Sequence, residues 1–393
     1  MGLIAHPVIS LFLSDSVVDL WPFYRISQNI SVIIYCGCMR AAAISTGPDT
    51  HLDHLGILAA ILDVPLIVTD RKSYELAQLF YPQAKPQFME HGELGLDFLA
   101  ANFDLLFSCG KFWCLELQPL FQLLFQKKMR FVFCPHGNSD KGSTLAAGDH
   151  PPQDIALVYG EHMHNLLQRT GALSQVGTTI TTGNYRYPFY LQHRAFYDTL
   201  AQEKIFCRFA SDKKTILYAP TWASSENPTA FYKACTQLVQ QLGPSYNLLI
   251  KPHPFLEEEQ PAHLAYLQSS YAHLPHVAFV TGFPAIYPLL AKADIYIGDF
   301  SSVGYDFLAF DRPLYFFNPR QKEVKENARP LLYKCGIEIP LHASQDLKKF
   351  LDETENTPNS ARREIYAHAF GQTRTNLKEE IIKNLIPKDE VLI

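Results

Sequence analysis

Histidine and serine side chains suited to binding phosphate stand just after strand-length apolar runs in the second half of the chain. His253 lies between two prolines soon after the run that ends at Ile250, and Ser301 and Ser302 follow the run from Ile295 to Ile297. An imidazole can give or take a proton near pH 7. Hydroxyls and free amides at the start of a helix can hold an anion. These residue types, placed after strands, predict a site for a phosphate-bearing ligand.

Three further polar residues lie in these two turns and in a third turn of the same kind. Thr221 follows the apolar run 216–219, Lys251 directly follows Ile250, and Asp299 stands two positions before the serines. Each turn also has an ordinary structural interpretation, because a serine at a helix start is more often only an N-cap. A histidine beside proline is often structural in the same way. The order and placement of the three turns together favour one shared site.

Strand and helix patterns alternate from Ile216 to Asn318, which predicts the elements that carry these turns. The helix after Asn227 is the clearest, since its apolar residues recur every three or four positions. They are Phe231, Ala234, Cys235, Leu238, Val239 and Leu242. Strands are expected at 216–219, 246–250, 277–280, 294–298 and 313–317, and further helices at 284–293 and 301–310. This alternation predicts a parallel sheet, which binds ligands at the carboxyl ends of its strands.

The first half of the chain shows the same alternation. Strands are expected at 31–35, 65–69, 103–107, 130–134 and 155–160, and helices at 55–62, 73–80, 114–125 and 161–169. The turn after 130–134 is the candidate site of this half. It places His136 and Lys141 just past a buried strand, and Gly137 permits close approach of a ligand.

Taken together, these turns resemble those of the CDP-glycerol glycerophosphotransferase family, whose members build polymers of the teichoic acid type. The likeness rests on Leu-Tyr-Ala-Pro-Thr-Trp at 217–222, Lys-Pro-His-Pro at 251–254, Asp-Phe-Ser-Ser-Val at 299–303, Asp-Phe at 306–307, Asp-Arg-Pro at 311–313, His-Gly at 136–137 and the lysine at 141. The resemblance implies an α/β, GT-B-like fold of two facing Rossmann-like domains with parallel sheets.

The resemblance also implies an activity. The expected enzyme is a transferase that moves a glycerol-phosphate-type group from a CDP-linked donor to an acceptor hydroxyl and releases CMP. It implies His136 as the catalytic base and His253 as a catalytic residue that contacts the diphosphate. The expected substrate-binding residues are Gly137, Lys141, Arg186, Thr221, Lys251, Asp299, Ser301 and Ser302. No metal or other cofactor is expected.

The chain departs from the family pattern at three places. Asn138-Ser139-Asp140 replaces the Thr-Pro-Leu that is common before the lysine, Ala223 stands where an arginine commonly follows Thr-Trp, and Gly183 to Arg186 lacks the family's proline. These changes leave the identity of the acceptor open. They also leave an inactive GT-B nucleotide-binding module as one alternative. Another is a nucleotide-sugar glycosyltransferase or sugar-nucleotide 2-epimerase, because fold alone does not separate these functions.

A second constellation suggests metal chemistry. Thr50 to His54 matches the second half of the metallo-β-lactamase-type signature His-x-His-x-Asp-His, whose residues bind metals that activate water. Asp49 replaces the first histidine, and residues 1–48 lack the β-rich lead-in of that fold. We therefore favour a turn in which Asp49 or Asp53 caps the helix that begins near His54.

Composition limits the partners and the setting. The formal net charge of −5 disfavours nucleic acid. Eight cysteines, several of them inside apolar runs, fit buried thiols in a reducing compartment, and no signal peptide or membrane span is predicted. We expect a cytoplasmic protein, with a peripheral contact at the inner face of the membrane left open. The expected partners are a CDP-linked donor and a lipid-linked or polymeric acceptor.

The length of 393 residues accommodates two domains. We expect an N-terminal Rossmann-like, acceptor-side domain at 1–190 and a nucleotide-binding one at 191–345. Residues 346–393 are expected to form helices that pack back across both. The boundary is expected within Tyr187 to Lys214, which shows little periodicity.

Overall fold

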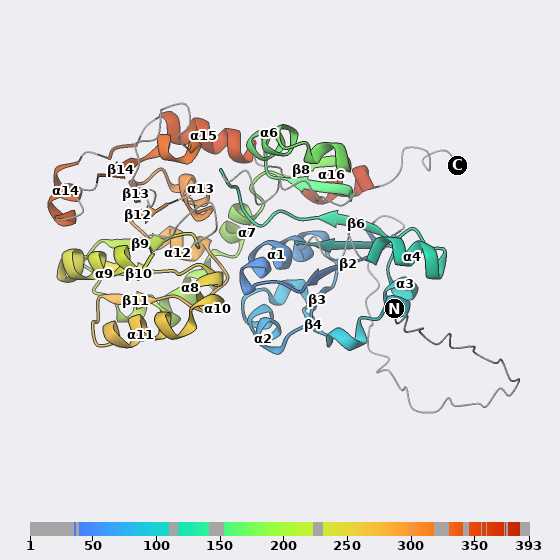
Figure 1. Ribbon diagram of the computed structural model, residues 1–393, viewed down its shortest axis with the longest axis horizontal. Coiled ribbons are helices and arrows are strands. Elements are labelled where there is room, and N and C mark those ends of the chain that lie inside the picture. The colour runs from blue at the N-terminus through green and yellow to red at the C-terminus, as the bar shows by residue number, and fades with distance from the viewer. Residues whose placement is uncertain are drawn as a thin grey trace, which may run out of the picture. The chain divides into compact units, whose positions relative to one another are not determined.

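The computed structural model describes residues 35–36, 39–109, 117–140, 153–222, 231–299, 301–317, 330–340, 346–354, 356–358, 360–372, 374 and 376–385. All of them belong to one compact unit, Ile34–Ile393. Within that unit the strands form two sheets, one from each half of the chain (Figure 1). The expected strand at 31–35 lies outside the described residues except for Tyr35.

The first sheet has the strand order β4-β3-β2-β5-β6-β7-β8, with β1 paired to β2. Its strands are β1 (Tyr35–Cys36), β2 (Met39–Ser45), β3 (Leu66–Val68), β4 (Gln87–Phe88), β5 (Leu105–Ser108), β6 (Arg130–Phe133), β7 (Gln153–Val158) and β8 (Val176–Thr181). The β1–β2 pair is antiparallel, and the other described pairs of this sheet are parallel. The helices associated with this half are α1 (Leu52–Leu62), α2 (Arg71–Phe80), α3 (Leu96–Asn102), α4 (Gln118–Phe125) and α6 (Glu161–Arg169).

The second sheet is parallel throughout its described pairs, in the order β11-β10-β9-β12-β13-β14. Its strands are β9 (Thr215–Ala219), β10 (Asn247–Ile250), β11 (Val277–Phe279), β12 (Ile295–Gly298), β13 (Leu314–Phe317) and β14 (Ile337–Ile339). Its helices are α9 (Phe231–Leu242), α10 (Pro254–Glu259), α11 (Pro261–Tyr271), α12 (Tyr287–Lys292) and α13 (Val303–Phe307). The six apolar residues predicted to face the core from α9 are all buried.

The order of this sheet explains where a ligand can bind. The chain leaves β9 for β10 on one side and later returns to β12 on the other side. Connections that leave a parallel sheet in opposite directions open a crevice at the carboxyl ends of the strands. The turns that carry Thr221, Lys251 and Ser301 all follow these three strands.

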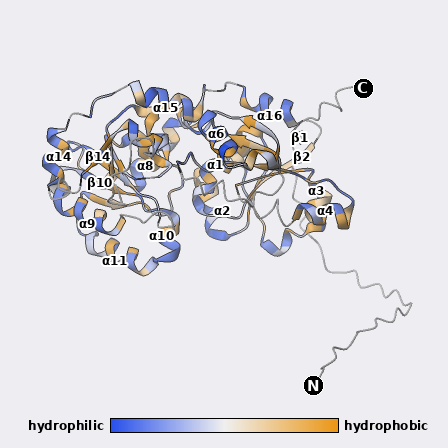
Figure 2. Ribbon diagram, turned by 45° about the horizontal axis from the view of Figure 1, so that its top comes forward, coloured by the Kyte–Doolittle hydropathy of each residue, from blue (hydrophilic) through white to orange (hydrophobic). Residues whose placement is uncertain are grey.

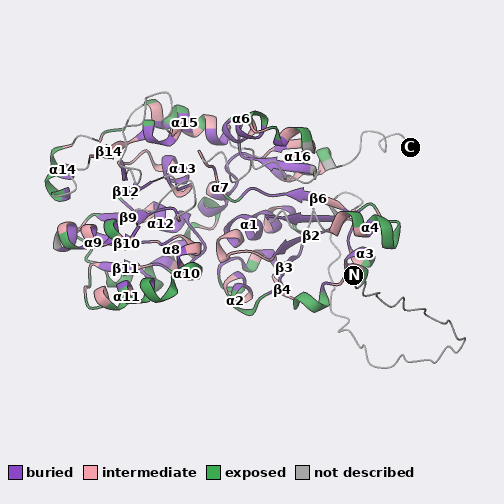
Figure 3. Cartoon of the chain, in the orientation of Figure 1, coloured by how far each residue is buried: buried purple, intermediate pink, exposed green. Residues whose placement is uncertain are grey.

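Burial follows the same plan. Hydrophobic residues concentrate on the strands (Figure 2). The strands are largely buried, whereas α2 and α11 expose one face and α4 is exposed over most of its length (Figure 3). No helix within the described ranges is long and apolar enough to cross a membrane.

Helices connect the two halves and follow the second. They are α7 (Arg186–Gln192), α8 (Arg194–Lys204), α14 (Leu347–Glu353), α15 (Ser360–Phe370) and α16 (Leu377–Leu385). Helix α15 contacts α6 from the first half and the 3-10 turn Leu331–Cys335 from the second, and α16 contacts α1. Helix α15 ends at Phe370, directly before Gly371, whose φ of +66° suits glycine.

The sequence patterns did not predict β2, α7 or α8. Strand β2 lies between β3 and β5 in the first sheet, and its core is Ala41-Ala42-Ala43, whereas alanine is depleted in strands. The segment 187–214, which shows little periodicity in the sequence, contains most of α7 and all of α8. Helix α7 contacts both α1 and α12, and its buried residues are Arg186, Phe189 and Tyr190. A buried face that includes an arginine gives no clear apolar stripe in the sequence. The expected division at 190/191 falls inside α7.

Candidate functional site

The carboxyl ends of β2 and β6 from the first sheet and of β9, β10 and β12 from the second lead into the walls of one pocket, which we call the sheet-edge pocket. Eight of the predicted site residues line it, and they are His136, Gly137, Arg186, Thr221, Lys251, His253, Ser301 and Ser302. Turns predicted to share a site therefore meet, although they lie up to 166 positions apart in the sequence, from 136 to 302. Lys141 and Ala223 lie outside the described residues.

Prolines shape both walls of the pocket. Pro135 precedes His136, Pro220 precedes Thr221, and Pro252 and Pro254 flank His253, and all four line the pocket. Proline fixes φ near −65° and adds no N–H donor. These turns therefore hold their polar residues on backbone with restricted freedom, which favours a preorganised site.

His253 presents a defined hydrogen-bonding form. The backbone N–H of Phe255 donates to Nδ1 of His253 at 3.2 Å, as His253 caps α10. Because Nδ1 accepts that bond, the proton of the neutral ring sits on Nε2. The neutral ring is therefore an N–H donor at Nε2, which is the form that a phosphate oxygen accepts.

Lys251 is the cation on this wall. Burial lowers its pKa, while Glu257, Asp53 and Asp49 raise it. Its Nζ donates to the carbonyl oxygen of Phe283 at 3.4 Å. Because this hydrogen bond is long, the ammonium can exchange it for a phosphate as a ligand enters.

Asp299 lies beneath the pocket and does not line it. Its Oδ1 accepts the backbone N–H of Thr221 at 2.7 Å, and both residues are 1% exposed. A buried carboxylate in this position fixes the turn after β9 to the turn after β12. Asp299 therefore holds the two turns together. Its contact with substrate stays a prediction.

Gly137 and Ser302 bring the two walls into contact. Gly137 has φ of +136°, and a Cβ built on it would lie 2.7 Å from Cβ of Ser302 and 2.8 Å from its Oγ. Cβ atoms do not approach other atoms this closely, so a side chain at 137 would displace Ser302. The close approach expected at this glycine is therefore made to the opposite wall.

Gly137→Ala should lower the free energy of unfolding by roughly 1–3 kcal/mol, because it adds overlap with Ser302 to an unfavourable φ. Urea unfolding measures this, and calorimetry should show weaker binding of nucleotide once Ser302 is displaced. Gly171→Ala is the matched control, since Gly171 has φ of +75° but nothing within 4 Å of its added Cβ. Equal costs at the two positions would show that the contact with Ser302 is unimportant.

The residues that depart from the family pattern tie the two halves together. Oδ2 of Asp140 accepts the hydroxyl of Tyr305 at 2.8 Å, and Asp140 also accepts the backbone N–H groups of Leu331 and Leu332 at 3.1 and 3.3 Å. Nδ2 of Asn138 donates to the carbonyl oxygen of Ala369 at 3.2 Å. These bonds hold the His136 turn against the second half and α15.

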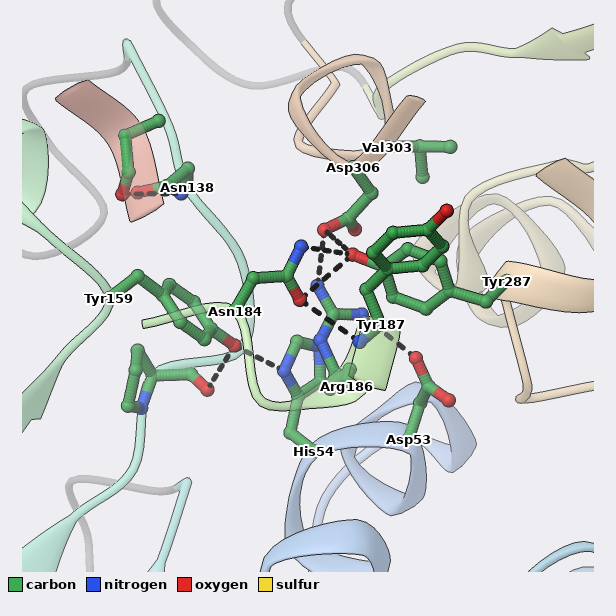
Figure 4. Close-up of polar contacts among 12 residues, drawn as sticks. Asp53, His54, Asn138, Tyr159, Asn184, Arg186, Tyr187, Tyr287, Val303 and Asp306 are labelled. Carbon is green, nitrogen blue, oxygen red and sulfur yellow. Dashed lines mark hydrogen bonds and ion pairs between the residues drawn. The ribbon is translucent and has the colours of Figure 1, made fainter. Parts of the chain in front are cut away.

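Arg186 is held by carboxylates from both halves (Figure 4). Its Nη1 lies 2.8 Å from Oδ2 of Asp53 in α1, and its Nη2 lies 2.6 Å from Oδ1 of Asp306 in α13. Asp306 also accepts the hydroxyl of Tyr287. Burial alone would lower the pKa of Arg186, but Asp306 and the surrounding groups hold it well above its ordinary value. Arg186 was predicted to bind substrate, and the structure shows it occupied by two ion pairs.

The residues of the metal-like signature do not form a metal site. Within the described ranges, no group of three or more His, Cys, Asp or Glu residues is placed to hold an ion. The predicted cap is also wrong, because α1 begins at Leu52 without a side-chain cap. Asp53 instead binds Arg186 and Tyr81, and Nδ1 of His54 shares a hydrogen bond with the Tyr159 hydroxyl.

Sequence reasoning did not assign His51, Asp306 or Asp140 to this site, and the structure places all three at or beside it. His51 was noticed only as a metal ligand. Asp306 was noticed only as part of the family resemblance and Asp140 only as a departure from it, because Arg186 and Tyr305, the partners that they bind, lie more than 100 positions away.

Two parallel α/β sheets whose strand ends share one pocket define the GT-B-like class of proteins, which confirms the fold expected from the sequence. Residues 149–378 match the model of the CDP-glycerol:poly(glycerophosphate) glycerophosphotransferase family. The match covers more than half of the chain, and the chain belongs to this family. The matched region begins at residue 149, after the His136 turn.

Curated relatives agree with this assignment. The chain is 26% identical over 245 residues to the teichoic acid glycerol-phosphate primase of Bacillus subtilis (strain 168), covering 59% of this chain and 58% of the primase. It is 27% identical over 175 residues to the teichoic acid poly(glycerol phosphate) polymerase of the same strain, covering 42% of this chain and 22% of the polymerase. The matched segment thus spans little more than half of the first relative and about a fifth of the second.

Solved structures support the fold. The wall teichoic acid polymerase TagF superimposes with a TM-score of 0.58 at 15% identity, covering 88% of this chain and 90% of that chain. The UDP-GlcNAc 2-epimerase of Neisseria meningitidis superimposes with a TM-score of 0.50 at 12% identity, covering 88% and 98%. Likeness at these identities concerns the fold.

Proposed function

We propose that the protein is a transferase that moves a glycerol-phosphate-type group from a CDP-linked donor to an acceptor hydroxyl, with release of CMP. The observation that carries this proposal is the sheet-edge pocket, which gathers a histidine from the first sheet and a phosphate-binding set from the second. Membership of the glycerophosphotransferase family supports the donor class.

The donor's diphosphate would bind the second-sheet wall. His253 supplies an N–H, Ser301 and Ser302 supply hydroxyls, and Lys251 supplies a positive charge. Charge that develops on phosphate oxygens during transfer is stabilised mainly by such fixed donors and cations. We assign Thr221 to support of this wall through its bond to Asp299.

The transfer step would use the opposite wall. His136 would take the proton of the acceptor hydroxyl as its oxygen attacks the phosphorus that carries the glycerol group. The bond from that phosphorus to the oxygen of CMP breaks, and CMP leaves with the electron pair, stabilised by the second-sheet donors. The contact of Gly137 with Ser302 supports attack across so short a gap.

The acceptor would be a lipid-linked or polymeric hydroxyl, as the names of the teichoic acid relatives suggest. Such an acceptor would bring the protein to the inner face of the membrane as a peripheral protein. We also assign residues 1–190 to the acceptor side and 191–345 to nucleotide binding, with 346–393 packing across both.

Calorimetric titration with CDP-glycerol, CMP, UDP and UDP-N-acetylglucosamine tests the donor assignment. We expect preference for the cytidine ligands, and weaker binding by at least about fivefold in Ser302→Ala and His253→Ala, since each loses a hydrogen bond to a charged group. Ser270→Ala is the matched control, because Ser270 lies on α11 and bonds the carbonyl oxygen of Tyr266.

Each other outcome has a clear meaning. Preference for uridine ligands would replace the proposal with a glycosyltransferase or 2-epimerase. Binding of no nucleotide would leave the family membership as ancestry without this activity.

A further inference from the structure

His51 lies in the sheet-edge pocket beside the candidate base, and neither the fold nor the proposed step uses it. It ends the 3-10 turn Asp49–His51 that leads into α1, and β2 before this turn is separated from β6 only by β5. The ring centroids of His51 and His136 are 4.8 Å apart, with an angle of 40° between the planes. The two imidazoles therefore lie side by side on the wall of the pocket that the first sheet provides, which we call the acceptor wall.

The backbone fixes the position of the His51 ring. A Cβ built on Gly47 would lie 2.4 Å from Nδ1 of His51 and 2.7 Å from its Cε1. Only glycine at 47 leaves room for the ring there. A side chain pressed between Gly47 and His136 is held in one orientation, as a substrate-binding group needs to be.

The His51 side chain also keeps its hydrogen-bonding capacity. His54, one turn further on, shares its Nδ1 with the hydroxyl of Tyr159. By contrast, His51 makes no side-chain hydrogen bond to the part of the chain that the structure describes. Burial and the neighbouring His136 lower the pKa of His51 to about 3. At neutral pH the ring is uncharged and offers one N–H donor and one acceptor nitrogen.

We infer that His51 binds the acceptor by holding the hydroxyl adjacent to the one that His136 deprotonates, so that the preferred acceptor is a polyol end with two neighbouring hydroxyls. This inference rests on the proposed function. A neutral imidazole suits this role, because a hydroxyl both donates and accepts. Two imidazoles in contact can each meet one oxygen of such a pair.

The test compares two acceptors at saturating CDP-glycerol. One is a short, lipid-free glycerol phosphate oligomer, and the other is the same oligomer with its terminal unit lacking the hydroxyl next to the attacking one. We expect the wild-type protein to prefer the diol by roughly tenfold in kcat/KM, about one lost hydrogen bond. His51→Phe should abolish the preference and raise KM for the diol, and His51→Gln should retain part of it.

Controls separate binding from folding and from catalysis. His91→Gln, at an exposed histidine, should behave as wild type. His51→Phe should bind CDP-glycerol normally by calorimetry, since the donor residues lie on the second sheet. The variant should also keep the acid limb of the pH–rate profile, because His51 is already neutral across that range and does not titrate in it. The titratable groups around His51 are His54 and His136, which face it, and Lys251 and His253, which share the pocket.

Three results would overturn the inference. If His51→Phe keeps the full preference for the diol, His51 does not contact the second hydroxyl. If His51→Phe binds CDP-glycerol more weakly, the role of His51 is structural. Loss of the acid limb would make His51 itself the titrating base. If the wild-type protein binds no cytidine nucleotide and turns over neither acceptor, the proposed function fails first and the inference fails with it.

Discussion

His136→Ala should slow transfer from CDP-glycerol by about 10²- to 10⁴-fold, the usual contribution of a positioned general base. The loss should appear in kcat, because His136 is expected to act on the attacking hydroxyl and not on the bound donor. Initial rates of CMP release at saturating donor and acceptor measure it. The affinity for CDP-glycerol should stay within about twofold of wild type, since the donor wall is built from the second sheet.

His136→Asn and His54→Gln are the informative companions. Asparagine keeps a hydrogen-bonding group at 136 but cannot take a proton at neutral pH, so it should be as slow as alanine. His54 is buried against Tyr159 on the same wall, and its replacement tests whether a nearby buried histidine gives the same loss through packing. A loss below tenfold in His136→Ala would exclude the base role.

The sequence predicted most of the second half of the molecule because its signals are local. Helix α9 shows its apolar stripe in the chain itself, and the strands before Thr221, Lys251 and Asp299 are short apolar runs bounded by turns. The elements that escaped prediction lack such signals. Strand β2 is rich in alanine, and the buried face of α7 includes an arginine.

The candidate site divides along the same line. His136, His253 and the serines follow strands, and topology alone brings strand ends together. His51 is placed within the first half, against His136 and Gly47. Asp140 and Asp306 owe their places to contacts across the two halves, with Tyr305 and Arg186. Such pairs depend on how the halves pack, which no local pattern encodes. Asn138 and Asp140, which depart from the family pattern in the sequence, form hydrogen bonds from the His136 turn to α15 and to Tyr305 in the structure.

Arg186→Met should lower the free energy of unfolding by roughly 3–5 kcal/mol, because it leaves two buried carboxylates without their cation. Asp53 is 3% exposed and Asp306 is 4% exposed, so neither can regain full hydration in the folded protein. Methionine keeps much of the volume of the side chain, which limits the loss to charge and hydrogen bonds. Urea unfolding of the variant against wild type measures the change.

Neutralising the carboxylates separates this ion-pair role from simple packing. Asp53→Asn and Asp306→Asn, added to Arg186→Met, should recover part of the lost stability, because the buried charges that the first change left unpaired are then gone. Arg194→Met is the surface control, since Arg194 pairs with Asp198 on one face of α8 and is largely exposed. It should leave unfolding unchanged.

The alternative for Arg186 is the one the sequence suggested, a direct contact with the donor's phosphates. That role predicts a different pattern. Arg186→Met would unfold at the same urea concentration as wild type, and its affinity for CDP-glycerol would fall by the free energy of at least one charged hydrogen bond. The two carboxylates make the stability loss the expected result, since the guanidinium is the cation that both of them bind, at 2.8 and 2.6 Å. Arg186 thus fixes α1, which begins directly after His51, against α13, which follows Ser302, and so sets the distance between the two walls across which transfer would occur.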